Sequence, residues 1–476
     1  MRKILLARVF QPYPVHVAGP PLGLMYLASA IRKFGKEQYQ IKIVDMNLTR
    51  MKPEKLKEVL HDFDPELVGL SALAFERQAV HRTARLIKEF KPDCRVVVGG
   101  PYGTMWSTEI LQDNRVDWVV IGEGEITFTE LLDTYFRDGD ITKVEGIAYR
   151  QNGNINHSGN RKPVADLDTL PFPAWDLVDI PAYSRWIQNA NVILAARPYM
   201  YIFTSRGCPF QCAYCHDIFG KSIREASPQN VLEQIKILVS RYRIKEFHIV
   251  DDCFNYHAER AKEICRRIIA EGLKIKIAFP NGIRADLLDR ELLSLLKKAG
   301  AYILSFAVES ASLRIQKMIK KNLDLNKAIE MIIASDQLGF LTKGYFMIGF
   351  PTETQEEINK TVDFAVKSPL LFASFFNVVP FRKTPLYELA RLQYPDIDNI
   401  DYDLYYYGKS FYSFATGFDL NKTQRKAYWK FYFPGRIFRI MRKPFLKFYS
   451  FRQIFISFLM IYLGKSLKRL RINLFI

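Results

Sequence analysis

The stretch RGCPFQCAYCHD, at residues 206–217, holds half of the six cysteines in the 476-residue chain. Cys208, Cys212 and Cys215 are so close in sequence that their thiols can face a common centre from one loop. Clustered thiolates bind soft metals, either zinc or an iron–sulfur cluster. A structural zinc ion takes four ligands, and no nearby CxxC or histidine pair completes the set. Three thiolates leave one metal position open, which is typical of a site that performs chemistry.

The composition is that of a globular protein with about two or three domains. Hydrophobic residues make up 49% of the chain and charged residues 25%, which excludes a disordered protein. No apolar run approaches the roughly 20 residues that span a bilayer. The opening MRKILLARVF predicts a β-strand rather than a signal peptide. Few cysteines outside one cluster exclude a disulfide framework, so we expect a cytoplasmic protein.

Residues 1–140 alternate short apolar runs with helical patterns in five strand–helix repeats. Val, Ile and Leu runs without alternation predict a parallel sheet buried on both faces, in a doubly wound, Rossmann-like α/β domain. Such sheets bind ligands beyond the carboxyl ends of their strands. The residues expected at those ends are Ser71, Gly99, Gly100, Gly122 and Glu123. Glycine there lets a backbone approach a ligand closely, although the same glycines can serve only to turn the chain.

Residues 141–195 are rich in Asn, Gly and Pro, which predicts a connector. In residues 196–400 the strand–helix alternation resumes in roughly six units, which predicts a partial (β/α)6 barrel of the TIM type with an open side. The active site of such a barrel lies at the carboxyl ends of its strands. Polar residues recur at the expected ends: Asp251, Asp252, Arg284, Glu309 and Glu353. The alternative explanation for these side chains is helix capping or ion pairing.

The spacing CxxxCxΦC, with Tyr214 as the aromatic Φ, resembles the signature of radical S-adenosylmethionine (SAM) enzymes. The preceding domain resembles the cobalamin-binding domain that is often fused to them, and the two resemblances together cover about residues 1–400. The resemblance implies that Cys208, Cys212 and Cys215 each bind one iron of a 4Fe–4S cluster. The methionyl amine and carboxylate of SAM would chelate the fourth iron.

The same resemblance implies roles for residues at the strand ends of the barrel. Asp251 and Asp252 would meet the SAM amino group. Arg284 would suit the SAM carboxylate, as a fixed planar donor does. Glu309 stands where the family often contacts the ribose hydroxyls. The remaining positions that match the family are Lys321, Gly349 and Pro351, although Thr352 and Arg382–Lys383 depart from its pattern.

In the first domain PPLGLMYLAS and GEGE resemble cobalamin-binding fusion partners. Ser71, Gly99 and Gly100 would then line the groove for the nucleotide tail. Domains that ligate cobalt through histidine use DxHxxG, whereas PVHVAG has Pro14 where the aspartate belongs. A metal-bound histidine normally has such a carboxylate partner. We therefore interpret His16 as a loop residue and expect cobalamin without a lower histidine ligand.

The implied chemistry begins when a reduced cluster passes one electron to SAM, from a donor such as flavodoxin or ferredoxin. SAM then yields a 5′-deoxyadenosyl radical that abstracts hydrogen from an unactivated carbon, which takes the methyl group of methylcobalamin. The sequence therefore predicts a cobalamin-dependent radical SAM C-methyltransferase that acts on a small-molecule or lipid-like substrate. The alternative is an oxidative cyclisation or rearrangement without methyl transfer, as in the Mg-protoporphyrin IX monomethyl ester cyclase type.

Two further classes are disfavoured. A non-catalytic sensor module does not need an open iron position together with polar residues at the strand ends. RNA-modifying methylthiotransferases share the barrel, but their N-terminal domain carries three cysteines of its own. Residues 1–140 contain Cys94 alone.

The charge is concentrated at the C-terminal end. The chain carries a net charge of +18, and residues 421–476 hold 14 Lys or Arg side chains and no Asp or Glu. We expect residues 401–476 to form a basic, aromatic-rich helical tail. Its part from 430 to 476 suits a helix in a membrane interface, which would place the protein peripherally on the inner face of the membrane. A helical cap packed on the barrel is the alternative, and nucleic acid is the least favoured partner.

Overall fold

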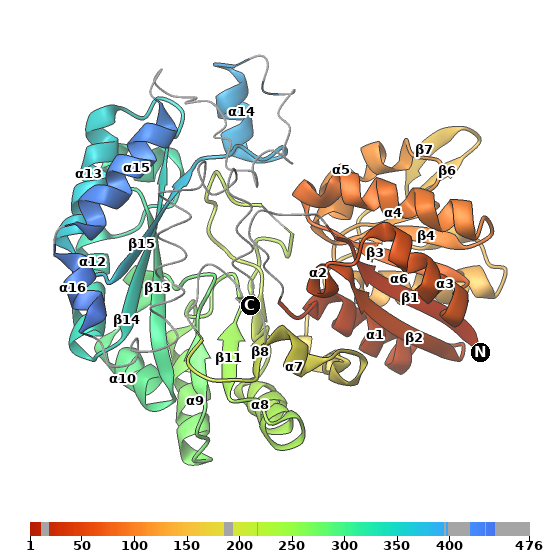
Figure 1. Ribbon diagram of the computed structural model, residues 1–476, viewed down its shortest axis with the longest axis horizontal. Coiled ribbons are helices and arrows are strands. Elements are labelled where there is room, and N and C mark those ends of the chain that lie inside the picture. Colours follow the sequence, from red (N-terminus) through yellow and green to blue (C-terminus); the bar gives the residue numbers. More distant parts are fainter. Residues whose placement is uncertain are drawn as a thin grey trace.

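The computed structural model describes residues 1–10, 19–184, 194–216, 218–394, 397, 419–433 and 435–442. Two α/β units lie side by side in it, the N-terminal one in red and orange and the barrel in green and blue (Figure 1). His16 and residues 443–476 lie outside the described residues.

The N-terminal sheet has seven strands in the order β2-β1-β3-β4-β5-β6-β7. The pairs among β1 to β5 are all parallel, and the chain winds outward in both directions from β1 and β3, as predicted. The strands are β1 (Arg2–Arg8), β2 (Tyr39–Asp45), β3 (Leu67–Ser71), β4 (Arg95–Gly99), β5 (Trp118–Val120), β6 (Ile147–Gln151) and β7 (Asn154–His157).

Helices cover both faces of this sheet. Successive residues of β1 point to opposite faces, so Leu5 packs toward α3, α4 and α5 while Leu6 packs toward α1 and α6. Burial of both faces explains the unbroken apolar runs of these strands. The helices of this unit are α1 (Leu22–Phe34), α2 (Met46–Thr49), α3 (Leu56–Phe63), α4 (Arg77–Phe90), α5 (Gly100–Leu111) and α6 (Gly124–Phe136).

The sheet continues through His157, into the segment predicted as a connector. β6 pairs antiparallel with β5, and β7 pairs antiparallel with β6. Asn152 and Gly153 join β6 to β7 with φ values of +52° and +78°. Positive φ at both positions defines a type I′ hairpin turn, for which Asn-Gly is the favoured pair. The QNGN stretch therefore carried a hairpin signal that was interpreted as a loop.

The second sheet has six parallel strands in the order β15-β14-β13-β12-β11-β8. Its two edge strands, β8 and β15, do not pair with each other, which confirms the predicted open, partial barrel. The strands are β8 (Tyr199–Ile202), β11 (Glu246–Ile249), β12 (Lys276–Ala278), β13 (Ala301–Glu309), β14 (Leu341–Ile348) and β15 (Phe372–Asn377), with a separate pair β9 (Ser205–Arg206) and β10 (Arg224–Glu225).

Helices follow the barrel strands on the outer face (Figure 1). Several of them begin where a Ser, Thr or Asp side chain accepts a hydrogen bond from a free backbone N–H of the first turn, as Ser227 does for α8. The helices are α7 (Ile180–Tyr183), α8 (Pro228–Tyr242), α9 (Ala258–Ala270), α10 (Arg290–Lys298), α11 (Leu313–Met318), α12 (Leu325–Gln337), α13 (Gln355–Lys367), α14 (Pro385–Arg391), α15 (Leu420–Tyr432) and α16 (Arg436–Met441).

α15 covers the edge strand β15. The Tyr428 hydroxyl accepts a hydrogen bond from Phe375 N–H (3.1 Å), and the Tyr432 hydroxyl accepts one from Ala373 N–H (3.3 Å). Gln424 donates to the Phe375 carbonyl (2.7 Å). These three side chains are four residues apart, so they lie in one row on the helix. They satisfy backbone groups that an uncovered edge would expose to other strands.

Arg436 of α16 fixes the C-terminal end of α13. Its guanidinium donates to the carbonyls of Ala365, Val366, Ser368 and Leu370. The last carbonyls of a helix have no partner within the helix, so a cation there is favourable. The described part of the predicted tail is therefore a cap packed on the barrel.

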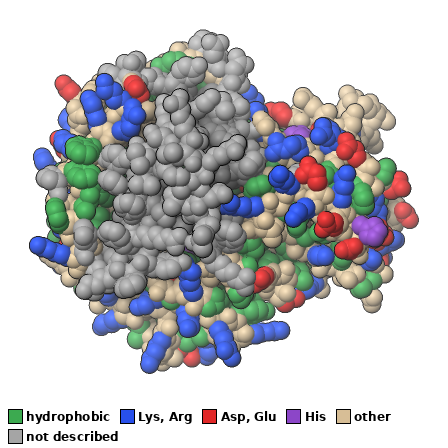
Figure 2. All heavy atoms as spheres, viewed as in Figure 1, with side chains coloured by type: hydrophobic (Ala, Val, Ile, Leu, Met, Phe, Trp, Pro, Cys, Tyr) green, Lys and Arg blue, Asp and Glu red, His purple; other side chains and the backbone are tan. Residues whose placement is uncertain are grey.

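Charge is mixed over the visible face of the N-terminal unit, where Lys and Arg alternate with Asp and Glu (Figure 2). Among the described residues there is no helix long and apolar enough to cross a membrane.

We expect the double substitution Tyr428→Phe with Tyr432→Phe to loosen β15. Each hydroxyl hydrogen bond contributes about 1 kcal/mol to the free energy of opening the strand edge. The amides of Ala373 and Phe375 should therefore exchange roughly fivefold faster for each bond that is lost. Hydrogen–deuterium exchange with mass spectrometry over residues 372–377 measures this. Trp429→Phe is the control, because Trp429 lies on the same helix and is 56% exposed. Unchanged protection in the double variant would contradict the role given to these hydroxyls.

Candidate functional site

The three cysteines lie on a loop that is closed by the antiparallel pair of β9 with β10. Cys208 N–H donates to the Gly220 carbonyl (3.3 Å), which folds the loop back on itself. Gly207 has a φ of +84°, and a Cβ there would lie 2.3 Å from the Ser222 carbonyl oxygen. Only glycine therefore fits immediately before the first cysteine.

The donor set fits a cluster better than a single ion. All three cysteine residues are partly exposed. No group of three or more His, Cys, Asp and Glu side chains among the described residues is placed to hold one metal ion. In an iron–sulfur cluster different thiolates bind different irons, so they need not converge on one point. Cys208, Cys212 and Cys215 are spread along one loop, so each can bind a different iron of one cluster.

A fourth thiol, Cys253, contacts Cys208. The hydrogen bond from Cys253 lowers the pKa of the Cys208 thiol to about 6, whereas burial raises the pKa of Cys215 to about 12. In the sequence Cys253 is isolated, far from the other three. The contact exists because β11 lies beside β8 in the barrel, which no local pattern reveals.

Ala213 holds the back of the loop. Its N–H donates to the Ile319 carbonyl and its carbonyl accepts from Leu386 N–H, both at 2.8 Å. Its side chain is 1% exposed and packs with Ile315 and Ile319. The small residue between Cys212 and Tyr214 lets the loop lie directly on α11 and the start of α14.

Three residues predicted to bind cofactor form one cluster beside the loop. The Tyr214 hydroxyl donates to Glu309 (3.4 Å), and Lys321 Nζ lies 3.2 Å from that hydroxyl and 3.5 Å from Glu309. Burial raises the pKa of Glu309, and Lys321 opposes that rise. Glu309 has a φ of +67°, which is rare for a non-glycine residue and typical of functional sites.

Arg284 is held against the same loop. Its guanidinium lies 3.7 Å from the centre of the Phe210 ring and donates twice to Asp286, at 2.8 and 3.0 Å. It also donates to the Lys321 carbonyl (3.0 Å). Its Nη1 donors make no hydrogen bond with a described residue, so they can still donate to an anionic ligand.

The two aspartates that follow β11 point to different partners. Asp251 is 2% exposed and accepts hydrogen bonds from Thr204 N–H and from the hydroxyls of Thr204 and Ser205. Asp252 accepts one from Gly207 N–H (3.2 Å) and lines the cavity between the domains. Burial raises the pKa of Asp252. Asp251 thus supports the start of the cysteine loop, and Asp252 faces open space.

Gly349 lies apart from these residues. It turns the chain after β14 with a φ of +90°, and a Cβ there would lie 2.5 Å from Leu420 of α15. The buried Glu353 carboxylate accepts hydrogen bonds from Gly349 and Phe350 N–H, and burial raises the pKa of Glu353 to about 7. The positive φ of this turn and the close contact with α15 are enough to require glycine at position 349, without any contact to a cofactor.

A cavity of about 600 Å³ lies between the two domains. On the N-terminal side its lining includes the predicted strand-end residues. These are Ser71, Gly99, Gly100, Gly122 and Glu123. On the barrel side it reaches His216 of the cysteine loop and Asp252, which follows β11. Apolar groups predominate, among them Leu27, Phe128 and Phe203.

The wall formed by the first domain fits a large cofactor that lies against backbone. Gly122 has a φ of +77°, and a Cβ there would meet nothing within 4 Å, so it would project into the cavity. Gly100 has a φ of +76° and sits where a Cβ would lie 3.0 Å from Ser71 Oγ. These glycines leave the strand ends without side chains, so a ligand can lie directly against the backbone.

Buried ion pairs fasten the cysteine loop to the first domain. Arg206 Nη2 donates to Glu125 at 2.6 Å, and Arg224 donates to both oxygens of Glu123, at 3.0 and 2.5 Å. All four side chains are at most 8% exposed. Burial alone would lower the pKa of Arg206, but Glu125 and Glu123 raise it. Sequence reasoning missed both arginines, although Arg206 opens the decisive stretch and the glutamates belong to GEGE.

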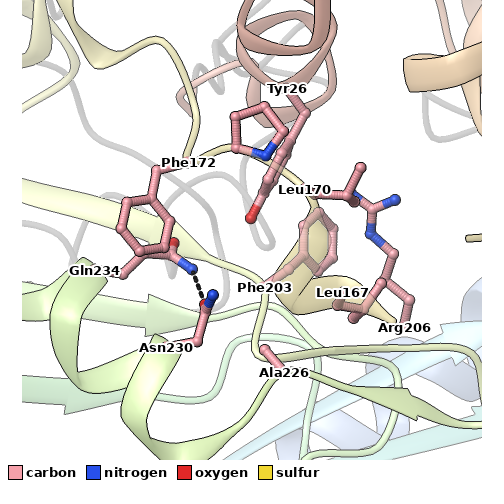
Figure 3. A pocket seen from close by; sticks show the side chains of 10 residues that line it. Tyr26, Leu167, Leu170, Phe172, Phe203, Arg206, Ala226, Asn230 and Gln234 are labelled. Atoms are coloured by element: carbon pink, nitrogen blue, oxygen red, sulfur yellow. Dashed lines mark hydrogen bonds between the residues drawn. The ribbon is translucent and has the colours of Figure 1, made fainter. Parts of the chain in front are cut away.

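Aromatic side chains enclose the Arg206 guanidinium, whose centre lies 5.0 Å from the Tyr26 ring and 5.5 Å from the Phe219 ring. Figure 3 shows Tyr26 of α1 and Arg206 on one side of a small cavity and Asn230 and Gln234 of α8 on the other. This cavity of about 20 Å³ is the size of one water molecule. This packing lies where α1 of the first domain meets α8 of the barrel.

Comparison with known proteins agrees with this architecture. Residues 202–365 match the radical SAM superfamily and residues 14–132 match the B12 binding domain. The uncharacterized methyltransferase PH0819 of Pyrococcus horikoshii is 33% identical over 79% of each chain. The cytidylyl-2-hydroxyethylphosphonate methyltransferase of Streptomyces wedmorensis is 30% identical over 76% of each chain.

Among solved structures, the radical S-adenosylmethionine methyltransferase TsrM of Kitasatospora setae, with cobalamin and a 4Fe–4S cluster bound, has the same fold. The TM-score is 0.67 at 19% identity, and the match covers 82% of this chain and 78% of that one.

The fold and the site define a radical SAM barrel joined to a cobalamin-binding domain. The chain belongs to the family of cobalamin-dependent radical SAM methyltransferases. Its cofactors are a 4Fe–4S cluster, SAM and cobalamin, which confirms the predicted enzyme class and cofactors. Radical SAM enzymes act on small molecules and need an electron donor.

We expect Glu125→Gln to loosen the junction between the domains, because it leaves the Arg206 charge buried without its closest partner. The cost of breaking a buried pair is about 3–5 kcal/mol. Limited proteolysis of the full chain, followed at residues 141–195, measures the opening.

Glu130→Gln is the matched control for this test. Glu130 lies on the same helix, α6, but its pair with Arg161 is 44% exposed at the carboxylate, so its loss should cost about 1 kcal/mol or less. Equal cleavage rates in the two variants would contradict a special role for Glu125.

Proposed function

We propose that the protein methylates an unactivated carbon of an apolar or lipid-like small molecule in the cavity between its domains. One observation carries this proposal: the strand ends of the first domain and the cysteine loop line the same cavity. When bound, the cluster and SAM supply a hydrogen-abstracting radical and cobalamin supplies the methyl group. The chain's own contribution is to place these groups around one substrate and to exclude water with Phe203, Phe219 and Phe381.

We assign SAM to the face of the loop that carries Tyr214 and lies beside Glu309 and Lys321. Glu309 is the residue proposed for the ribose hydroxyls, and its strained backbone holds the carboxylate in place. The Nη1 donors of Arg284 would bind the SAM carboxylate. Of the two aspartates, Asp252 is the better candidate for the SAM amino group, because Asp251 already accepts three hydrogen bonds.

We propose that the cobalamin-binding domain spans residues 1–140 and is extended by the hairpin through His157. The radical SAM barrel spans residues 196–400. Residues 401–476 are a C-terminal region whose first helices cap the barrel. Ser71, Gly99, Gly100, Gly122 and Glu123 are the proposed cobalamin contacts.

An oxidative cyclisation or rearrangement is the second candidate function. Anaerobic magnesium-protoporphyrin IX monomethyl ester cyclases are among the relatives of this chain, one at 25% identity over 85% of it. They favour a reaction that uses the same two domains without methyl transfer.

Metal content and methyl transfer test the proposal together. After anaerobic reconstitution with iron, sulfide and hydroxocobalamin, we expect roughly four irons and one cobalt per chain. With methyl-labelled SAM and a lipid extract of the source organism, label should appear in a carbon-bound methyl group. Cys212→Ala should lose iron and product.

Other outcomes separate the two candidates. Formation of 5′-deoxyadenosine with an altered but unlabelled product would favour cyclisation. Four irons without cobalt would contradict methyl transfer from cobalamin.

We further propose a cytoplasmic protein that contacts the inner face of the membrane through its C-terminal residues. The sequence of 443–476 joins apolar and aromatic residues to Lys and Arg. Phe438 of α16 is 63% exposed and lies five residues before this segment. Deletion should start at residue 443, because α15 and α16 stabilise the barrel.

We expect the full chain to float with anionic liposomes and the chain truncated after residue 442 to float less. Liposomes without anionic lipid are the control. Equal flotation of both chains would contradict membrane contact through this segment.

A further inference from the structure

The two domains meet through ion pairs of different exposure on opposite sides of the cavity. On one side lies the buried pair of Arg206 with Glu125, whose side chains are 4% and 8% exposed. On the other side Arg382 Nη1 of the barrel lies 3.6 Å from Glu109 Oε1 of α5, and these side chains are 35% and 49% exposed. Figure 1 shows α5 and α14 in the upper part of the molecule and α1 and α8 in the lower part. The first pair is sealed from solvent, and the second is open to it.

The exposed pair borders the cavity directly. Phe381, the residue before Arg382, lines the cavity, and so does Met105, four residues before Glu109. We call residues 380–383, with the sequence PFRK, the strap. The cavity therefore extends up to the contact between α5 and the strap, where it comes closest to solvent-exposed side chains.

The strap is held to the start of α14. Thr384 donates to the Phe381 carbonyl through its N–H (3.2 Å) and through its hydroxyl (2.6 Å). The Thr384 hydroxyl also accepts a hydrogen bond from Tyr387 N–H in the first turn of α14 (3.2 Å). Lys383 completes this tight turn with a φ of +65°. The backbone on the barrel side of the exposed pair is thus well anchored.

The other side of the exposed pair is carried by an interrupted helix. Within α5, Trp106 has a φ of −130° and a ψ of 34°, which are not helical values. The interruption lies between Met105, which lines the cavity, and Glu109, which pairs with Arg382. A helix broken at one residue can shift one part against the other, because the dihedral change is confined to the break. Glu109 can therefore leave Arg382 without displacing the strand ends.

We propose that cobalamin and the substrate enter the cavity between α5 and the strap, with Phe381 as the gate and the pair of Arg382 with Glu109 as the latch. The proposal rests on the proposed function, because it takes this cavity as the place of reaction. An exposed ion pair contributes little to stability and is weakened by salt, so it can open repeatedly. A buried pair such as that of Arg206 cannot, because opening leaves an uncompensated charge. Closing the latch then keeps water from the reaction.

The latch involves a residue that departs from the family's pattern. PFRKTPLY, at residues 380–387, has Arg382 and Lys383 at the departing positions. The resemblance to the family therefore does not imply this contact. It follows from the arginine that this chain carries and from the glutamate that α5 places opposite it.

The test measures how fast a ligand enters, which does not depend on catalysis. Hydroxocobalamin is the probe, and the change in its absorption spectrum on mixing follows its uptake by the full chain reconstituted with iron and sulfide. Glu109→Arg places two cations at the latch, and Glu109→Arg combined with Arg382→Glu restores opposite charges. Glu130→Arg is the matched control, because Glu130 lies on α6, outside the cavity lining, and is 44% exposed in its pair with Arg161.

We expect Glu109→Arg to take up hydroxocobalamin about threefold faster than the wild type at low salt, because repulsion raises the fraction of open molecules. The double variant should return to the wild-type rate, and the control should not differ from it. Added salt should speed uptake by the wild type, because it screens the latch, and should slow uptake by Glu109→Arg, because it screens the repulsion. The final cobalt content per chain should be the same in all four.

A second variant tests the gate while the latch is intact. Phe381→Ala removes the ring that lines the cavity beside the latch, so uptake should again be about threefold faster. Phe90→Ala is its control, because Phe90 is 41% exposed at the end of α4 and does not line the cavity. This variant also keeps the proposal testable if Glu109→Arg does not fold.

Two outcomes would overturn the proposal. One is an equal uptake rate in the wild type, Glu109→Arg, Phe381→Ala and the controls. The other is a double variant that stays as fast as Glu109→Arg, which would mean that the two charges do not act on each other. If the wild type takes up no cobalamin, the proposed function itself is rejected, and that result is distinct from equal rates of uptake.

Discussion

The buried ion pairs of Arg206 with Glu125 and of Arg224 with Glu123 are the constraint on which the rest of the site depends. They join the two strands that close the cysteine loop to the turn after β5 in the first domain. Buried pairs of this kind add little stability over apolar contacts, because both charges must be desolvated. Their value is geometric, since a small displacement leaves a charge buried without its partner.

Geometry matters here because the reaction needs three cofactors around one substrate. The first domain supplies strand ends kept flat by glycine, and the barrel supplies a loop held against α11 through Ala213. Neither wall by itself determines its distance from the other. The two ion pairs do so: Arg206 stands two residues before Cys208, and the partner glutamates, Glu125 and Glu123, belong to the GEGE turn. The constraint therefore acts next to both cofactor sites.

The sequence allowed the fold class, the cluster loop and most strand-end residues to be predicted, because each depends on local spacing or on an apolar period. Contacts between distant segments could not be predicted. Cys253 meets Cys208 and Asp251 holds Thr204 because β11 pairs with β8. The QNGN hairpin was missed for another reason, since a polar turn between short strands resembles a loop until a neighbouring strand pairs with it.

The helix α15 shows how the same limitation applied to the tail. Its aromatic residues, counted together with Lys and Arg, suggested a membrane surface. Tyr428 and Tyr432 instead turn their hydroxyls to the edge of β15, and Phe431 is 2% exposed. An open barrel leaves an edge strand that must be covered, and a row of side chains four residues apart can supply donors and acceptors along it. Composition alone does not distinguish this row from a membrane-facing one, because the difference lies in which partner the hydroxyls find.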